Sequence, residues 1–216
     1  MTALASLWAD PSVELILRTT ATSPFGRKVR IAANVLGLDG RLQRRDANTL
    51  DPQDDLRRQN PLGKMPCLLV GGEAFYDSSV ILEMLDALAG GSQLLPSAEF
   101  PLERYRVLTR ARLADGIAEA ALLMVYERRF REPGQISQRW LEHQRDKVMR
   151  GLAAFTAHPP DTSRADMVSI GLACALGYLD WRKPVDWRGA HPQLVGWLKS
   201  FAGAIPAYSA TEGTRA

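Results

Sequence analysis

The chain has 216 residues, with 46% hydrophobic and 24% charged side chains and a formal net charge of +3. Its arginines are spread along the sequence, so the clustered charge and the motif of a nucleic-acid-binding protein are both missing. No apolar run approaches the roughly 18 residues that cross a bilayer, and residues 1–10 lack the basic start of a signal peptide. We therefore expect no nucleic-acid partner, no membrane span and no signal peptide.

The first part of the chain, residues 12–88, alternates between strand-like and helix-like segments. Short apolar runs predict strands at residues 13–17, 42–46, 66–70 and 74–76. The Gly71-Gly72 pair between the last two strands is a hairpin signal. Helices are expected at residues 29–36, at 51–60 after the start signal Asp51-Pro52, and at 78–88 with Ser78 as the cap. The expected order is β-α-β-α-β-β-α.

The rest of the chain has no good strand signal. After a linker at residues 90–96, helical patterns extend over residues 101–130, 137–156, 166–180 and 192–201. We therefore expect an α/β domain at residues 1–90 and an all-α domain at residues 97–216.

The two cysteines and the three histidines carry less information. Cys67 and Cys174 each lie in an apolar run, so we expect buried free thiols and a reducing, cytoplasmic compartment. The histidines have neither ligand spacing nor paired cysteines, so no metal site is expected. They are His143, His158 and His191.

The first chemically suggestive feature is the turn that leads into the first predicted helix, Thr22-Ser23-Pro24-Phe25-Gly26. It puts a hydroxyl at a helix N-terminus, where backbone N–H groups and the helix dipole favour an anion. A thiolate there would gain a donated hydrogen bond worth about 1.5–3 kcal/mol, comparable to the cost of lowering a thiol pKa by about two units. The alternative is that Ser23 only caps its own helix.

Two further loops carry related signals. In the loop at residues 60–66, a cis Met65-Pro66 bond would leave the Met65 backbone free to pair with a peptide ligand as an added strand. At Asp77-Ser78, helix N–H groups can receive a carboxylate and the Asp77 side chain can receive an ammonium group. The alternative for Asp77-Ser78 is an ordinary helix cap.

Together these three pieces resemble the glutathione S-transferase family, and the resemblance covers nearly the whole chain. The run at residues 23–30 looks like that of the bacterial serine-type members. The loop at residues 60–66 is similar to the family's Asn-Pro-x-Gly-x-x-Pro loop, whose last proline is cis, and Asp77-Ser78 matches its Asp/Glu-Ser pair. Residues 170–182 look like the family's buried core helix.

The resemblance implies a thioredoxin-like first domain that holds glutathione, an all-α second domain that carries the acceptor site, and a homodimer. Ser23 would stabilise the glutathione thiolate, and Phe25 would belong to the glutathione-binding residues and lie beside the acceptor. Met65, before Pro66, would pair with the cysteinyl part, and Asp77 and Ser78 would hold the γ-glutamyl end. The acceptor, a small electrophile, would lie against residues 106–112 and 124–126.

The sequence departs from the family at the start of the core helix. The family opens this helix with Ser/Thr-x-x-Asp, whereas this chain has Asp166-Met-Val-Ser169. Asp166 can still cap, but Ser169 is expected to reach back less well than an acidic residue, with some loss of local stability. The pair Ser23 and Gly26 also carries no thiol, which excludes thiol–disulfide exchange at that position.

Three functions are compatible with these residues. The first is an enzyme that adds glutathione to an electrophile, with Ser23 activating the thiol. The second is a glutathione-dependent isomerase or dehalogenase of small acids, whose carboxylate the arginines of the second domain would hold. The third is a non-catalytic glutathione-binding or regulatory protein, because fold alone does not fix function.

Overall fold

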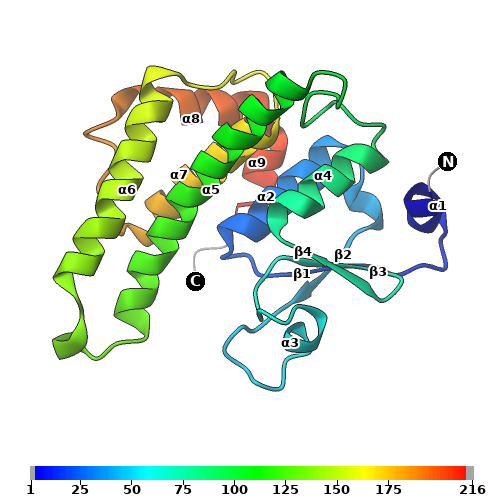
Figure 1. Cartoon of the computed structure of the whole chain (residues 1–216), viewed down its shortest axis with the longest axis horizontal. Helices are drawn as coiled ribbons and strands as arrows, with labels where there is room; N and C mark the ends of the chain where they lie inside the picture. Colours follow the sequence, from blue (N-terminus) through cyan, green and yellow to red (C-terminus); the bar gives the residue numbers. More distant parts are fainter. Residues whose placement is uncertain (1–2, 213–216) are drawn as a thin grey trace. The chain divides into compact units, whose positions relative to one another are not determined.

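The structure, a computed structural model, describes residues 3–212. These residues form two compact units, one of residues 3–104 with 209–212 and the other of residues 105–208. Figure 1 labels the helices and strands of both. The first unit contains α1 (Ala3–Ala9), β1 (Leu15–Thr19), α2 (Pro24–Val35), the short 3-10 helix η1 (Asp39–Arg41), β2 (Gln43–Asp46), α3 (Leu56–Gln59), β3 (Cys67–Val70), β4 (Glu73–Tyr76) and α4 (Ser78–Leu88).

The strands of the first unit form one mixed sheet in the order β2-β1-β3-β4. β1 and β2 are parallel, β3 runs antiparallel to β1, and β4 returns antiparallel to β3 through Gly71 and Gly72, which both have positive φ. The predicted β-α-β-α-β-β-α order and the hairpin are thus confirmed. The helix α1 was not predicted from the sequence.

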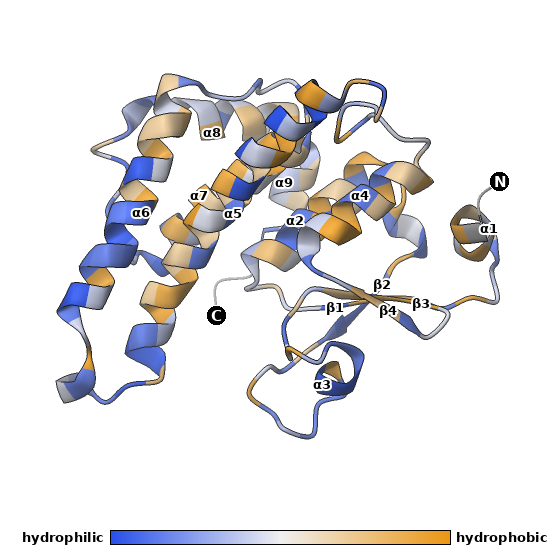
Figure 2. Cartoon of the chain, in the orientation of Figure 1, coloured by the Kyte–Doolittle hydropathy of each residue, from blue (hydrophilic) through white to orange (hydrophobic). Residues whose placement is uncertain are grey.

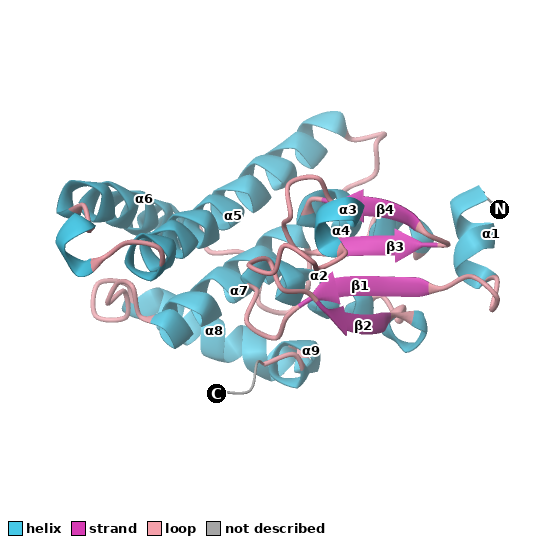
Figure 3. Ribbon diagram, turned by 90° about the horizontal axis from the view of Figure 1, so that it is seen from below, coloured by secondary structure: helices cyan, strands magenta, loops and turns pink. Residues whose placement is uncertain are grey.

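Helices cover both faces of this sheet, with α2 and α4 on one side and α3 on the other (Figures 1 and 3). The side of α3 is closed by a small hydrophobic cluster that includes Ile16 of β1, Leu56 of α3 and Cys67 of β3. On the side of α2 and α4, Leu15 and Leu17 of β1 are at most 1% exposed. Because successive side chains of a strand point to opposite faces, the fully buried β1 contributes to both cores.

Two predicted features of the first unit are wrong. The helix expected from Asp51 begins only at Leu56, because the Asp51 carboxylate accepts a hydrogen bond from the Gln53 N–H and closes a local turn instead. The cap of α4 is Asp77 rather than Ser78, since the Asp77 carboxylate accepts from the Ser79 N–H at 2.8 Å.

The helical unit contains most of α5 (Pro101–Arg129), the 3-10 helix η2 (Pro133–Gln135), α6 (Gln138–Ala157), α7 (Met167–Arg182), α8 (Pro192–Ala204) and most of α9 (Pro206–Ala210). In this part of the described chain there is no strand, and the four predicted helices are present, whereas α9 was not predicted. In Figure 2, α6 carries many hydrophilic residues, whereas the visible part of α7 is largely hydrophobic. All residues from Met167 to Leu176 are buried, as expected for a core helix.

Close helix contacts and one strong cap hold this unit together. A Cβ atom at Gly151 of α6 would lie 2.6 Å from Ile117 of α5, and one at Gly171 of α7 would lie 3.1 Å from Ala114. At the start of α7 the capping box is complete, because the Asp166 carboxylate accepts from the Ser169 N–H and the Ser169 hydroxyl accepts from the Asp166 N–H, each at 2.9 Å. Ser169 therefore reaches back to the Asp166 N–H, against the expectation, while the expected loss of local stability stays a prediction.

Candidate functional site

The turn between β1 and α2 places Ser23 at the N-cap of α2. Its backbone is extended, Pro24 is the first helical residue, and its Oγ accepts a hydrogen bond from the Gly26 N–H at 3.1 Å. The cap uses one acceptor lone pair of the hydroxyl, so the O–H remains able to donate to an anion. Capping and anion binding are therefore compatible roles of Ser23, and α2, with 12 residues, supplies a full helix dipole behind it.

Two threonines beside Ser23 tie this turn to the second loop. The Thr20 and Thr22 hydroxyls are 3.0 Å apart, and Thr20 Oγ1 also lies 3.5 Å from Met65 Sδ. The structure thus brings the β1–α2 turn and the Met65 loop together in one unit. The sequence analysis did not single out Thr20, and no local pattern indicates this contact because the two residues are 45 positions apart.

Gly26 is a second feature that the sequence analysis missed. A Cβ atom there would lie 1.7 Å from Thr19 Oγ1 of β1, so only glycine lets the first turn of α2 approach the strand this closely. Phe25, the neighbouring residue in α2, is half-buried. The signal that could have found Gly26 is a glycine in the first turn of an otherwise good helix.

The loop before β3 is held by Asn60, which is buried. Its side-chain amide donates to the Lys64 carbonyl at 2.8 Å and accepts from the Leu62 N–H at 3.0 Å. The loop ends in a cis Met65-Pro66 peptide bond, as the sequence suggested. Within residues 3–212, no protein group forms a hydrogen bond with the Met65 backbone, so its N–H and C=O are free for a ligand.

A buried ion pair attaches the segment before this loop to the sheet. Arg18 of β1 contacts the Asp54 carboxylate at 2.6 Å and the Gln59 side chain at 2.7 Å. The Asp54 carboxylate also accepts from the backbone N–H groups of Asn48 and Leu56, each at 2.7 Å. These backbone hydrogen bonds, with Arg18 as a further contribution, hold the pKa of Asp54 below its ordinary value.

The third loop places Asp77 and Ser78 at the start of α4. Asp77 has a φ of 67°, a region that costs a non-glycine residue free energy and often marks a binding site. One of its carboxylate oxygens caps Ser79, and Ser78, the first residue of α4, is 5% exposed. The first N–H groups of α4 have no carbonyl partner within the helix, and besides the Ser79 N–H, which Asp77 caps, they can receive an anionic group.

The other candidate groups have no role in this arrangement. Cys67 and Cys174 are both buried and neither forms a disulfide, and burial raises the pKa of the Cys67 thiol. Among the described residues, no group of three or more His, Cys, Asp or Glu side chains is placed to hold a metal ion. No helix between residues 3 and 212 combines the length and the apolar character needed to cross a membrane.

Family models match both parts of the chain. The N-terminal glutathione S-transferase domain matches residues 22–88, and the C-terminal domain of the same family matches residues 138–200. The chain belongs to the glutathione S-transferase family. The fold is accordingly that of these transferases, with a thioredoxin-like first domain followed by a helical one.

Several relatives of this transferase-family chain are known. The uncharacterized GST-like protein YibF of Escherichia coli is 35% identical over 182 residues, which cover 81% of this chain and 87% of YibF. A glutathione transferase family member from Pseudomonas fluorescens, crystallised with glutathione, is 38% identical with a TM-score of 0.83, covering 93% of this chain and all of that one. A structure of a P. fluorescens family member with S-(propanoic acid)-glutathione has 38% identity and a TM-score of 0.78, covering 92% and 98%.

Proposed function

We propose that this chain is a glutathione transferase that conjugates the glutathione thiolate to small electrophiles. The observation that carries the proposal is the Ser23 hydroxyl at the N-terminus of α2, which accepts from its own helix and keeps its O–H for a sulfur anion. Such a hydroxyl lowers the thiol pKa and raises the thiolate concentration at neutral pH. The glutathione-bound relative from P. fluorescens supports glutathione as the co-substrate.

The remaining proposed contacts involve the backbone of Met65 and the groups at the start of α4. The Met65 N–H and C=O, before the cis Pro66, would pair with the cysteinyl backbone of glutathione as an added strand. Asp77 and Ser78 would hold the γ-glutamyl end, the first through its carboxylate and the second at the start of α4. Phe25, half-buried in the first turn of α2, would face the acceptor.

The test compares Ser23→Ala with Ser23→Thr. The alanine variant is expected to lose about tenfold to a hundredfold in conjugation rate with a model aryl halide, because it loses a charge-assisted hydrogen bond of about 1.5–3 kcal/mol. Glutathione affinity should change far less. The threonine variant keeps both cap and donor and should stay near the parent rate. Thiolate absorbance of bound glutathione, titrated against pH, should show a raised thiol pKa in Ser23→Ala.

A matched control separates thiol activation from helix capping. Ser137 caps α6 as Ser23 caps α2, its Oγ accepting from the Trp140 N–H at 3.2 Å. Ser137→Ala therefore removes a cap worth about 1 kcal/mol without touching the proposed thiol site. Its conjugation rate should equal that of the parent. An equal rate in Ser23→Ala and the parent would remove Ser23 from the mechanism.

A second candidate is a glutathione-dependent reaction of small acids, including isomerisation or dehalogenation. It is favoured by the P. fluorescens structure that holds a glutathione conjugate bearing propanoic acid. Screening short halogenated and unsaturated acids against neutral electrophiles separates the two. Glutathione binding without turnover of either panel would instead indicate the third possibility, a non-catalytic binding protein.

We further propose a homodimer in a reducing, cytoplasmic compartment. The location is supported by Cys67 and Cys174, neither of which forms a disulfide. The dimer is supported by exposed apolar side chains of the first unit: Leu62 is 69% exposed, Val80 50% and Tyr76 39%. They lie close in the chain to the proposed glutathione contacts, and the proposal requires that they form one contiguous apolar patch, because such patches, unlike singly scattered apolar residues, mark an interface.

A further inference from the structure

Two arginines and two tyrosines gather where α5 and α7 end in the helical unit. We call Tyr126, Arg129, Tyr178 and Arg182 the arginine–tyrosine cluster. The contact between Gly171 and Ala114 sets the register of the two helices, which run in the same direction (Figure 1). Counting the same number of residues toward the C-terminus of each helix leads from Gly171 to Arg182 on α7, and from Ala114 to the residue before Tyr126 on α5. The last turns of both helices therefore lie at one level.

The guanidinium groups of this cluster lie over aromatic rings. Arg182 Cζ is 3.6 Å from the centre of the Trp181 ring, and Arg129 Cζ is 5.7 Å from that of Tyr126. Arg182 Nε is buried and has no hydrogen-bond acceptor. Buried N–H groups are almost always bonded. Arg18 and Arg41 also have a buried Nε without an acceptor, but both bond protein oxygens through their other guanidinium nitrogens, whereas Arg182 has no bond to a protein carboxylate or carbonyl in the described part of the chain and can donate one to a ligand.

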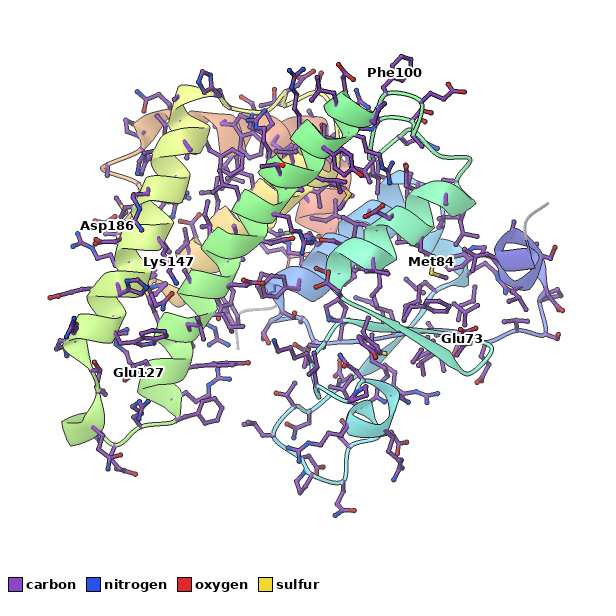
Figure 4. All side chains as sticks on the ribbon, in the orientation of Figure 1. Glu73, Met84, Phe100, Glu127, Lys147 and Asp186 are labelled. Atoms are coloured by element: carbon purple, nitrogen blue, oxygen red, sulfur yellow. The ribbon has the colours of Figure 1, made fainter. Side chains whose placement is uncertain are left out.

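The two partly or fully buried carboxylates nearest this end of the unit, Glu127 and Asp180, are already engaged. Glu127, labelled in Figure 4, accepts from the Ser137 N–H at 3.0 Å and pairs with Arg131 at 2.8 Å. Asp180 is bonded by the Trp187 indole and pairs with Arg188 at 2.6 Å. Among the described residues, neither Arg129 nor Arg182 pairs with an acidic side chain. The cluster therefore carries two positive charges without a counter-charge of its own.

The tyrosine between the arginines stays a neutral donor. Tyr178 is 5% exposed, and burial raises its pKa to about 12, although the charges of Arg182 and Arg129 and a side-chain hydrogen bond with Arg182 act in the opposite direction. Its phenol is thus protonated at neutral pH. The helix dipole explains a cation in the last turn of a helix, and Arg128 uses it by donating to the Met124 carbonyl. It does not explain a buried Nε–H without an acceptor.

We propose that the arginine–tyrosine cluster binds the carboxylate of a small organic acid that has an apolar body. A guanidinium offers planar, paired donors that match a carboxylate. In the chain, Met124 precedes Tyr126 by two residues and Val185 follows Arg182 by three, so the hydrophobic cluster of Met124, Leu141 and Val185 adjoins the last turns of α5 and α7 and favours a hydrocarbon body over a hydrated inorganic ion. The proposal concerns the helical unit alone; that such an acid is the acceptor rests on the proposed transferase function.

The test uses 3-phenylpropionate and its neutral isostere 3-phenylpropanamide, each titrated into the full chain without glutathione. The acid, but not the amide, is expected to shift the Nε–Hε resonance of Arg182, assigned by its absence in Arg182→Lys. That variant keeps the positive charge but loses the paired N–H donors of the guanidinium, so it should bind the acid about tenfold more weakly. Tyr178→Phe should weaken binding by a few fold, about the effect of one neutral hydrogen bond.

The control variant is Arg128→Lys, which should bind the acid as the parent does. Circular dichroism checks that Arg182→Lys is folded, and its glutathione affinity should equal that of the parent. Three results would each overturn the proposal: the amide binds as tightly as the acid, Arg182→Lys binds the acid as tightly as the parent does, or inorganic phosphate displaces the bound acid as effectively as unlabelled acid does. Acid binding by a chain that fails to bind glutathione would support this site and reject the proposed transferase function.

Discussion

At the scale of single residues, the buried ion pair of Arg18 and Asp54 holds the segment that leads to the proposed glutathione site. Arg18 and Asp54 are 5% and 12% exposed in their side chains, and the Asp54 carboxylate also receives two backbone N–H groups. Because Gln59 bonds the same guanidinium, the pair fixes the segment that ends at Asn60, where the Met65 loop begins. Removing one partner leaves a buried charge without compensation.

Asp54→Asn should therefore destabilise the protein by about 3 kcal/mol at pH 7, as for other broken buried pairs. The folded-state pKa of Asp54 is depressed, so its contribution is present above the ordinary pKa of about 3.9 and is lost as the pH falls through the lower folded value. Urea unfolding should therefore show that the difference in free energy of unfolding between parent and variant becomes smaller as the pH drops from about 5 toward 2.

The neighbouring Asp55 provides the control for that prediction. Asp55 pairs with Arg58, but both side chains are largely exposed, at 54% and 81%. Asp55→Asn should therefore change the free energy of unfolding by less than about 1 kcal/mol, as for exposed pairs in general. Similar losses in both variants, or a gap for Asp54→Asn that does not depend on pH, would show that the Arg18 pair contributes no special stability.

At the scale of elements, the start of α2 depends on a glycine rather than on helix propensity. Gly26→Ala would put a methyl group 1.7 Å from Thr19 Oγ1 and should destabilise the protein by about 1–3 kcal/mol, with weaker glutathione binding as Ser23 shifts. Adding Thr19→Ala removes the clashing oxygen and should restore most of the loss. Thermal unfolding and glutathione titration of the three variants measure both effects.

Gly116 is the matched control, because it lies inside α5 and a Cβ atom there would meet nothing within 4 Å. Gly116→Ala should stabilise the protein by roughly 0.5–1 kcal/mol through helix propensity alone. If Gly26→Ala proved equally stabilising, the close approach of α2 to β1 would not be needed for the fold.

The elements also show how far a sequence pattern reaches. The helices of the second unit were predictable because each buries one face or all of its surface, and the hairpin because Gly71-Gly72 fits its turn. The start of α3 was not predictable, because the Asp51 side chain bonds the Gln53 N–H in a turn and does not cap a helix. The Thr20–Met65 and Arg18–Asp54 contacts join residues 45 and 36 positions apart, and no local rule predicts such pairs.

The candidate site follows the same division. Ser23 and the start of α4 were found because caps and turns leave local signals, whereas the cis Met65-Pro66 bond was expected from the family resemblance of its loop. Their support was not found: Gly26 acts through a strand, and Asn60 acts through hydrogen bonds to its own loop. Whether these residues bind glutathione stays a prediction, since it depends on a ligand that meets all three segments.

At the scale of the whole molecule, the exposed apolar side chains of the first unit lead to a prediction about assembly. Val80 follows the start of α4 and is 50% exposed, so a second copy would bury it at low cost. Val80→Asp places a charge at this position, and burying an unpaired charge costs several kcal/mol. Light scattering should therefore give twice the chain mass for the parent and the single chain mass for the variant.

Leu7→Asp is the control, because Leu7 on α1 is 41% exposed and lies in a different element, so its variant should keep the parent mass. A monomeric parent, or a Val80→Asp variant that remains dimeric, would contradict the proposed interface. If dimer contacts order the start of α4, Val80→Asp should also weaken glutathione binding, and dilution of the parent below its dimer dissociation constant should reproduce that loss without any substitution. This concentration dependence separates an effect of assembly from a local effect of the new charge.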